Sequence, residues 1–130
     1  MDQGRIAAHA VMTGIPDEEL DAVAGAASER EFAAGETVMA EGDFGHSVLL
    51  IEDGTVEVSI DGTRVRELGP GEMLGEVAVL ASGRRTASVV ALTPLRVISL
   101  FKRDVWALER TAPEAARRLR AAIDEHVGSA

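Results

Sequence analysis

The sequence has no cysteine and no tyrosine, and its aromatic residues are three phenylalanines and one tryptophan among 130 residues. Without cysteine, disulfide bonds and thiolate metal sites are excluded. With so few aromatic rings, the core must be built mainly from valine, leucine, isoleucine and alanine.

Basic residues are also scarce, with 13 lysines and arginines against 22 acidic residues and a formal net charge of −9. Such a surface repels nucleic acid and anionic membranes, so we expect no nucleic-acid partner. No apolar run approaches the roughly 18 residues of a membrane span, and residues 5–12 are too short and polar for a signal peptide. The sequence therefore predicts a cytoplasmic protein without membrane insertion.

A chain of this length with 46% apolar residues supports one globular core, and we expect a single domain over 1–130. Residues 1–28 are expected to be helical, because Pro16 and three following acidic residues make a good first helical turn. Residues 29–101 contain short apolar stretches separated by glycine-containing turns, which is typical of a barrel or sandwich. Residues 102–128 have a helical pattern again.

Strand signals within 29–101 are clear. Val56, Val58 and Ile60 alternate with polar residues, which predicts a strand with one buried face. Asp61 and Gly62 follow directly and predict a two-residue hairpin turn. Apolar runs predict three more strands, of which the first is expected to be covered on both faces: 48–51, 88–91 and 95–100.

Two helices are expected after the strands. The first covers 102–110, with Trp106 as its anchor to the β-structure. The second is expected to begin at Thr111, because Thr111 and Glu114 have the spacing of a capping box. Its apolar stripe could pack on the β-structure, cover a ligand or pair with another copy of the chain in a homodimer: Ala116, Leu119, Ile123 and Val127.

A candidate anion site interrupts the strand pattern. Gly75 and Glu76 can open a short helix whose free backbone N–H groups would bind an anion, and Gly75 lets the backbone approach closely. Arg85 offers a planar set of donors suited to a phosphate, whereas Glu76 would face a hydroxyl group. A cyclic nucleotide, with a ribose hydroxyl and a singly charged phosphate, fits these requirements.

These residues also carry a resemblance. Residues 74–79 and 85–89, "LGEVAV" and "RTASV", resemble the phosphate-binding cassette of cyclic nucleotide-binding domains. Residues 41–54, "EGDFGHSVLLIEDG", resemble the other signature of that family, which includes the bacterial catabolite activator, protein kinase A regulatory subunits and cyclic nucleotide-regulated channels. The resemblance covers about 15–125.

The resemblance implies an eight-stranded β-roll, mainly β with flanking α-helices, with the cassette at 74–89. It implies that Arg85 binds the cyclic phosphate, that Glu76 binds the ribose 2′-hydroxyl, and that backbone N–H groups of the cassette complete the cradle. Apolar side chains would lie near the purine, and the last helix would close over it. The ligand-binding residues implied are Val58, Leu68, Leu74, Gly75, Glu76, Val77, Ala78, Arg85, Thr86 and Ala87.

Two positions depart from the pattern of many relatives, and a third bears on the choice of nucleotide. Many relatives carry Phe in place of Leu74 and Pro in place of Arg84, but neither position supplies a required charge, and Arg84 is expected to be an exposed cation. Thr86 resembles cGMP-preferring kinase sites, in which the hydroxyl contacts guanine. Pacemaker channels share "GRRTASV" and favour cAMP, so both cAMP and cGMP stay open as the ligand.

The sequence thus predicts a sensor without an output domain of its own, which moves its C-terminal helices on binding. We expect that it either regulates a separate effector protein or is a piece of a larger protein. The alternative is a β-roll interaction module that has lost its ligand. A metal-dependent cupin enzyme is a remote third possibility, because His9, His46 and His126 are scattered singly and no nucleophile–base pair is recognisable. We expect neither enzymatic activity nor a cofactor beyond the cAMP or cGMP ligand.

Overall fold

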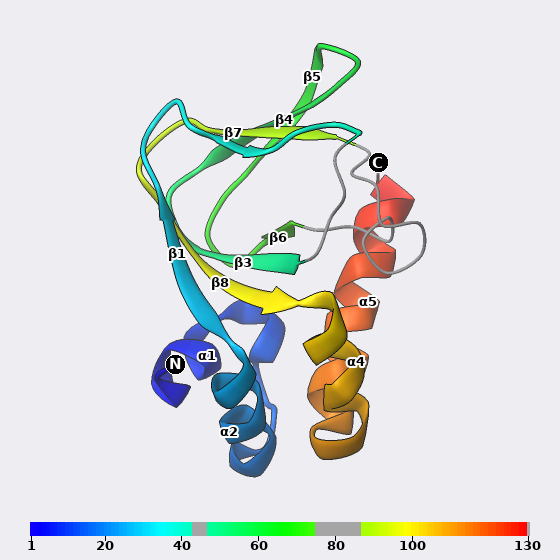
Figure 1. Cartoon of the computed structure of the whole chain (residues 1–130). Helices are drawn as coiled ribbons and strands as arrows, with labels where there is room; N and C mark the ends of the chain where they lie inside the picture. The colour runs from blue at the N-terminus through cyan, green and yellow to red at the C-terminus, as the bar shows by residue number, and fades with distance from the viewer. Residues whose placement is uncertain (43–46, 75–86, 130) are drawn as a thin grey trace.

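The computed structural model describes residues 1–42, 47–74 and 87–129, with side chains described up to Ala122. These residues form eight strands with helices before and after them (Figure 1). The helices are α1 (Gln3–Ala8), the 3₁₀ helix η1 (Ala10–Met12), α2 (Asp17–Ala26), α4 (Lys102–Thr111) and α5 (Pro113–Ser129). The strands are β1 (Ser28–Phe32), β2 (Thr37–Met39), β3 (Ser47–Asp53), β4 (Val56–Ile60), β5 (Thr63–Leu68), β6 (Met73–Leu74), β7 (Ser88–Ala91) and β8 (Leu95–Phe101).

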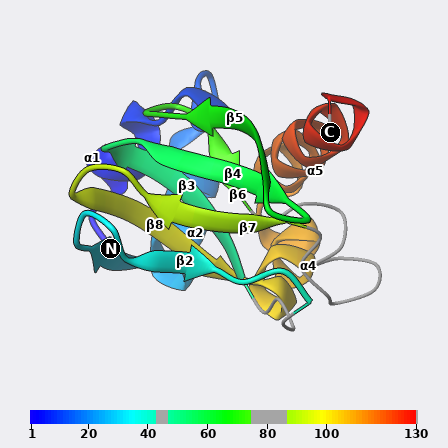
Figure 2. The same cartoon turned by 90° about the horizontal axis from the view of Figure 1, so that it is seen from above.

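The strands make two antiparallel sheets, in the orders β1-β8-β3-β6 and β2-β7-β4-β5. Figures 1 and 2 show the sheets facing one another as a roll, with α1, α2 and α4 on the outer side of the first sheet and α5 running up beside the roll. The β-roll with flanking helices, expected from the sequence, is confirmed.

Strand β3 separates two apolar clusters. Leu49 and Ile51 belong to the cluster between the two sheets, whereas Val48 and Leu50 belong to the cluster between the first sheet and the helices. Side chains alternate between the two faces of a strand, so the run is buried on both sides. This confirms the prediction of a strand covered on both faces.

The β4–β5 hairpin also follows the sequence. Val56 and Val58 are buried on the inner face of β4, and Ile60 pairs with Thr63 across the turn. Asp61 has φ of 51° and Gly62 has φ of 79°, as a two-residue turn with positive φ at both central positions requires. Asp61 is the non-glycine residue with positive φ in the described part of the chain.

The expectation for Trp106 is wrong. Val105 and Leu108 are buried against the helical layer, whereas Trp106 is 45% exposed. Residues three apart share a face of a helix, and each successive residue turns by about 100°. Because Val105 and Leu108 are the residues of α4 that face inward, Trp106 is directed toward solvent.

The predicted capping box is also wrong. Helix α4 continues through Thr111 and α5 begins at Pro113, so the one residue between them leaves Thr111 no place as a cap. The cap comes from α2 instead, because the backbone N–H of Ala115 donates to Glu19 Oε1 at 2.9 Å. Glu114 pairs with Arg117 on the same helix. A carboxylate at a helix N-terminus is stabilising. The carboxylate of Glu19 therefore joins α2 to α5, two helices that are far apart in the sequence.

We expect Glu19→Ala to lower the free energy of unfolding by about 1 kcal/mol, the usual effect of losing a helix cap. Glu18→Ala is the matched control, because Glu18 lies in the same first turn of α2 and is exposed. Urea unfolding of both variants measures the difference. Equal losses in the two variants would contradict the capping role.

Candidate ligand-binding site

The interior of the roll contains an apolar cluster between the two sheets. Val58 on β4, Leu68 at the end of β5, Leu74 on β6 and Ala87 just before β7 all belong to it. None of the four is more than 8% exposed. The structure thus brings these four sequence-predicted residues together as core residues, and their contact with a ligand remains a prediction.

The two described ends of the candidate cassette lie on opposite sheets. Leu74 pairs with Leu49 on β3 in the first sheet, and Ser88 pairs with Ser59 on β4 in the second sheet. The cassette therefore starts and ends at the walls of the interior cluster. The other six predicted residues lie outside the described residues: Gly75, Glu76, Val77, Ala78, Arg85 and Thr86.

Two buried hydroxyl groups in the inner wall were missed from the sequence. Ser47 lies two residues before Leu49 on β3, and Ser99 pairs directly with Leu49 from β8. Alternation along a strand places Ser47 on the inner face with Leu49, and Ser99 on the inner face with Val97. Counting by two from the apolar inner residues would have found both serines. They are polar positions in an otherwise apolar wall, near Leu74.

A third serine fixes the end of the cassette. Ser88 Oγ accepts a hydrogen bond from the backbone N–H of Glu41 at 3.0 Å. The carboxylate of Glu41 in turn accepts from the N–H of Asp61 at the tip of the β4–β5 hairpin, at 3.1 and 3.2 Å. The start of β7 is thereby tied to the residues after β2 and to the hairpin. Sequence reasoning included Ser88 in the cassette motif and in a strand but gave its side chain no role.

Comparison with known proteins identifies the family to which this arrangement belongs. A family model described as "Cyclic nucleotide-binding domain" matches residues 29–111. The chain belongs to the cyclic nucleotide-binding domain family. The resemblance inferred from the sequence is confirmed, and residues 29–111 of this cyclic nucleotide-binding domain include all eight strands except the first residue of β1.

The relatives of this cyclic nucleotide-binding domain include a receptor protein and a protein kinase. The chain is 32% identical over 115 residues to the cyclic AMP receptor protein of Thermus thermophilus, covering 85% of this chain and 53% of that protein. It is 36% identical over 80 residues to a cGMP-dependent protein kinase of Drosophila melanogaster, covering 62% of this chain and 7% of the kinase. The chain thus spans about half the length of its bacterial relative and a small part of the kinase.

A solved structure agrees with the fold. The crystal structure of Thermus thermophilus catabolite activator protein matches with a TM-score of 0.78 at 30% identity, covering 91% of this chain and 58% of that one. In the described part of our chain, no helix is long and apolar enough to cross a membrane. The described residues also bring together no group of three histidine or acidic side chains that could hold a metal ion.

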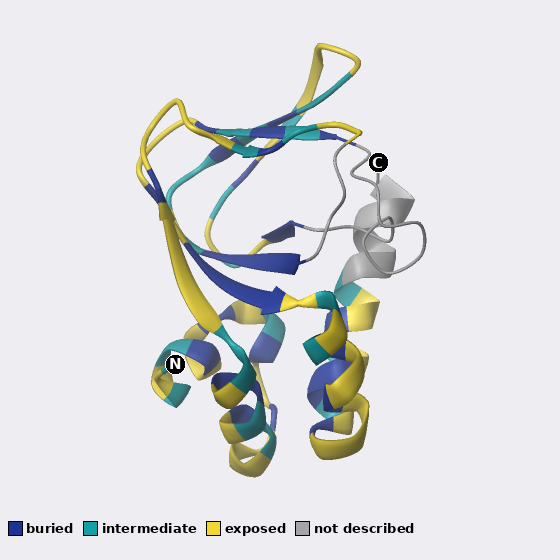
Figure 3. Ribbon diagram, in the orientation of Figure 1, coloured by how far each residue is buried: buried dark blue, intermediate teal, exposed yellow. Residues whose placement is uncertain are grey.

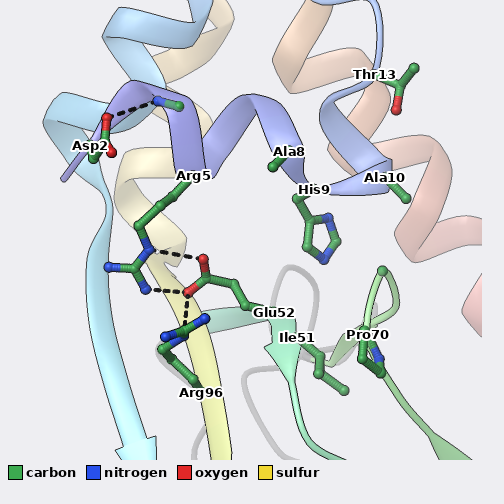
Figure 4. Close-up of a pocket in the computed structure, with 12 residues that line it drawn as sticks. Asp2, Arg5, Ala8, His9, Ala10, Thr13, Ile51, Glu52, Pro70 and Arg96 are labelled. Atoms are coloured by element: carbon green, nitrogen blue, oxygen red, sulfur yellow. Dashed lines mark hydrogen bonds and ion pairs between the residues drawn. The ribbon is translucent and has the colours of Figure 1, made fainter.

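A hollow of about 860 Å³ lies between the N-terminal segment and the roll (Figure 4). Arg5 on α1 bonds Glu52 on β3 with two nitrogens and Glu29 on β1 at 3.0 Å, and Arg96 on β8 lies 3.7 Å from Glu52. Hydrogen bonds to the carboxylates of Glu52 and Glu29 raise the pKa of Arg5 above its ordinary value. Two cations and two carboxylates balance, so the cluster fastens α1 to the roll without favouring a charged ligand.

His9 is buried in the wall of this hollow, between α1 and η1. Its Nδ1 accepts from the backbone N–H of Val11 at 3.2 Å, so the neutral ring carries its proton on Nε2. Burial lowers the pKa of His9, although the backbone carbonyls of Ile51 and Glu72 and the charge of Glu52 partly oppose this. The folded chain therefore favours the neutral imidazole.

We expect stability to fall as the pH is lowered below about 6.5, where an unperturbed imidazole takes up a proton. The unfolded chain is protonated first, because the pKa of His9 is lower in the folded chain. His9→Asn keeps an acceptor for the Val11 N–H and does not titrate, so its stability should depend less on pH. Urea unfolding between about pH 7.5 and 5.5 compares the two. Identical pH slopes would exclude this role of His9.

Proposed function

We propose that the chain is a sensor domain that binds cAMP or cGMP inside its β-roll. The observation that carries this proposal is that the family's phosphate-binding cassette, with Glu76 and Arg85 retained, starts and ends at the interior apolar cluster. An apolar wall suits a purine base, and the charged residues suit the sugar and phosphate. The names of the Thermus thermophilus and Drosophila melanogaster relatives support cAMP and cGMP, respectively, as ligands.

The proposed contacts follow the family pattern. Arg85 holds the cyclic phosphate and Glu76 holds the ribose 2′-hydroxyl, while Thr86 is the candidate contact to a guanine base. The backbone at Gly75, Val77, Ala78 and Ala87 donates to the phosphate, and the purine lies against Val58, Leu68 and Leu74. Ser47 and Ser99 add hydroxyl groups to the same inner wall.

Signalling is proposed to pass through the C-terminal helices. Helix α5 is fastened at its start to the N-terminal segment, through Glu19 and through Arg118, which donates to the carbonyl of Thr13 at 2.9 Å and to that of Val11 at 3.5 Å. A ligand that favours one position of α5 would therefore also move the N-terminal helices. We propose a single domain over 1–130, with the roll at 29–101, that regulates an effector and can act as a homodimer.

Calorimetric titration with cAMP and with cGMP tests the proposal. We expect one site per chain with micromolar or tighter affinity for at least one nucleotide, and Thr86→Ala should reduce any preference for cGMP. Mass spectrometry of the denatured protein shows whether the site was already occupied on purification. An empty site with neither heat nor a thermal shift would favour the non-binding interaction module.

A further inference from the structure

An exposed aromatic surface lies where β8 passes into α4. Phe101 is 47% exposed and Trp106 is 45% exposed, and with Lys102 and Arg103 they line an open hollow of about 430 Å³. Figure 3 shows the exposed residues at this junction, beside the buried length of β8. We call these four residues the aromatic surface.

The placement of the rings is unusual for this chain. The whole sequence has four aromatic residues, and two of them, including its one tryptophan, are exposed in the same hollow. The other large exposed apolar residues of the described chain are Val65 and Leu92, which belong to the β5 strand and to the turn after β7. Single exposed apolar residues are common, but paired exposed aromatic rings mark interaction sites.

The stability of α4 does not explain why a phenylalanine occupies position 101. It is the N-cap residue of α4 and gives no side-chain hydrogen bond to the helix. Serine, threonine, asparagine and aspartate are preferred at this position because their side chains cap the backbone. Trp106 likewise points away from the two buried residues of α4, Val105 and Leu108. Neither ring is needed for the core.

The charge of the surface complements an acidic partner. The ammonium of Lys102 lies 5.3 Å from the centre of the Trp106 ring, and the guanidinium of Arg103 lies 5.2 Å from that of Phe101. Within the described part of the chain neither cation pairs with a carboxylate, and Asp104 is the neighbouring acidic residue. Five other arginines do pair with glutamates: Arg5, Arg64, Arg96, Arg117 and Arg120.

We propose that the aromatic surface binds an acidic segment of a partner protein, which inserts an apolar side chain between Phe101 and Trp106. The rings supply the apolar contact and the two cations supply specificity for acidic flanks. The surface lies outside the interior cluster, so this proposal is independent of nucleotide binding.

Trp106 reports binding directly, because it is the one tryptophan and tyrosine is absent. The probes are short peptides with a central leucine, isoleucine, phenylalanine or tyrosine flanked by aspartates and glutamates. We expect at least one to produce a saturable blue shift of the indole emission without cAMP or cGMP present. Phe101→Ser keeps the reporter and supplies a favoured N-cap, and it should weaken binding about tenfold or more.

Further variants separate apolar from electrostatic contributions. Replacing Lys102 and Arg103 together by glutamine should weaken binding about three- to tenfold, and added salt should have a similar effect. Leu92→Ser is the matched control, since Leu92 is an exposed apolar residue elsewhere. It should bind the peptide like the unmodified chain.

Several results would overturn the proposal. These are no saturable shift with any acidic peptide, equal binding of peptides with lysine flanks, or tighter binding of a short RNA. Emission typical of a buried indole in the free protein would mean that the chain itself covers the surface. A dimer in sedimentation velocity that dissociates on Phe101→Ser would make the occupant a second copy of the chain.

Discussion

Arg85→Leu is expected to weaken binding of cAMP or cGMP by at least about a hundredfold, because hydrogen bonds to charged groups contribute about 1.5–3 kcal/mol each. Arg85 is the proposed partner of the cyclic phosphate, and a guanidinium can donate two parallel hydrogen bonds to it. The described interior wall is largely apolar and cannot replace that charge. Calorimetry of the variant measures the change, and thermal melting without ligand checks that the variant is folded.

Two further variants test whether the guanidinium itself is needed. Arg85→Lys keeps the charge but loses the planar pair of donors, so its affinity should lie between those of the parent chain and Arg85→Leu. Arg84→Leu removes the neighbouring cation and should change the affinity only a few-fold, because Arg84 is expected to remain in solvent. Equal losses for Arg84→Leu and Arg85→Leu would show a general effect of charge and would refute the specific role of Arg85.

Much of the roll could be predicted because its signals are local. The turn at Asp61 and Gly62 depends on backbone sterics within two residues, and both residues have the positive φ that was expected. The apolar run in β3 and the strands on each side of Pro94 are likewise set by short patterns. Such features depend little on what the rest of the chain does.

The two wrong expectations concern the cap of α5 and the burial of Trp106. Both depend on contacts with segments that are far away in the sequence. The cap of α5 is Glu19, which is 96 residues away from Ala115 in the sequence, so no local motif could reveal it. The orientation of Trp106 depends on which residues of α4 face inward, and these are Val105 and Leu108. The large apolar ring of Trp106 suggested that it would be buried instead. Hydrophobicity alone does not establish burial, since large apolar residues also occur on surfaces.

The candidate site likewise has one part that the sequence predicts and one part that depends on strand pairing. The family resemblance names the charged and backbone groups of the cassette, but it gives no account of the wall opposite them. That wall is defined by which strands pair, and pairing places Ser99, Leu49 and Leu74 side by side across the first sheet. Counting by two along β3 and β8 would have suggested that Ser47 and Ser99 face inward, but only the strand register places Ser99 beside Leu49 and Leu74.

Gly54→Ala is expected to lower the free energy of unfolding by about 3–5 kcal/mol, from backbone strain and overpacking together. Gly54 has φ of 96°, and a Cβ at this position would lie 2.3 Å from the carbonyl oxygen of Pro94 and 3.0 Å from the Cα of Leu95. Backbone atoms on both sides limit the movement that could relieve the contact. Urea unfolding measures the loss.

Gly62→Ala is the matched control for Gly54→Ala. Gly62 has φ of 79°, but a Cβ there would meet nothing within 4 Å, so the loss should be only the conformational cost of about 1–2 kcal/mol. The difference between the two variants therefore isolates the contact with Pro94. Equal losses would mean that positive φ alone explains the glycine at position 54.

The contact at Gly54 matters because of where it lies. The β3–β4 and β7–β8 connections both pass between the two sheets, and Gly54 and Pro94 belong to these two connections. The N–H of Thr55 donates to Thr93 Oγ1 at 3.0 Å, and the N–H of Leu92 donates to the carbonyl of Thr55 at 2.9 Å, so the connections are hydrogen-bonded as well. A side chain at position 54 would separate them and open the closed end of the roll. The cassette begins and ends on those same two sheets, so we expect Gly54→Ala to weaken nucleotide binding as well as stability.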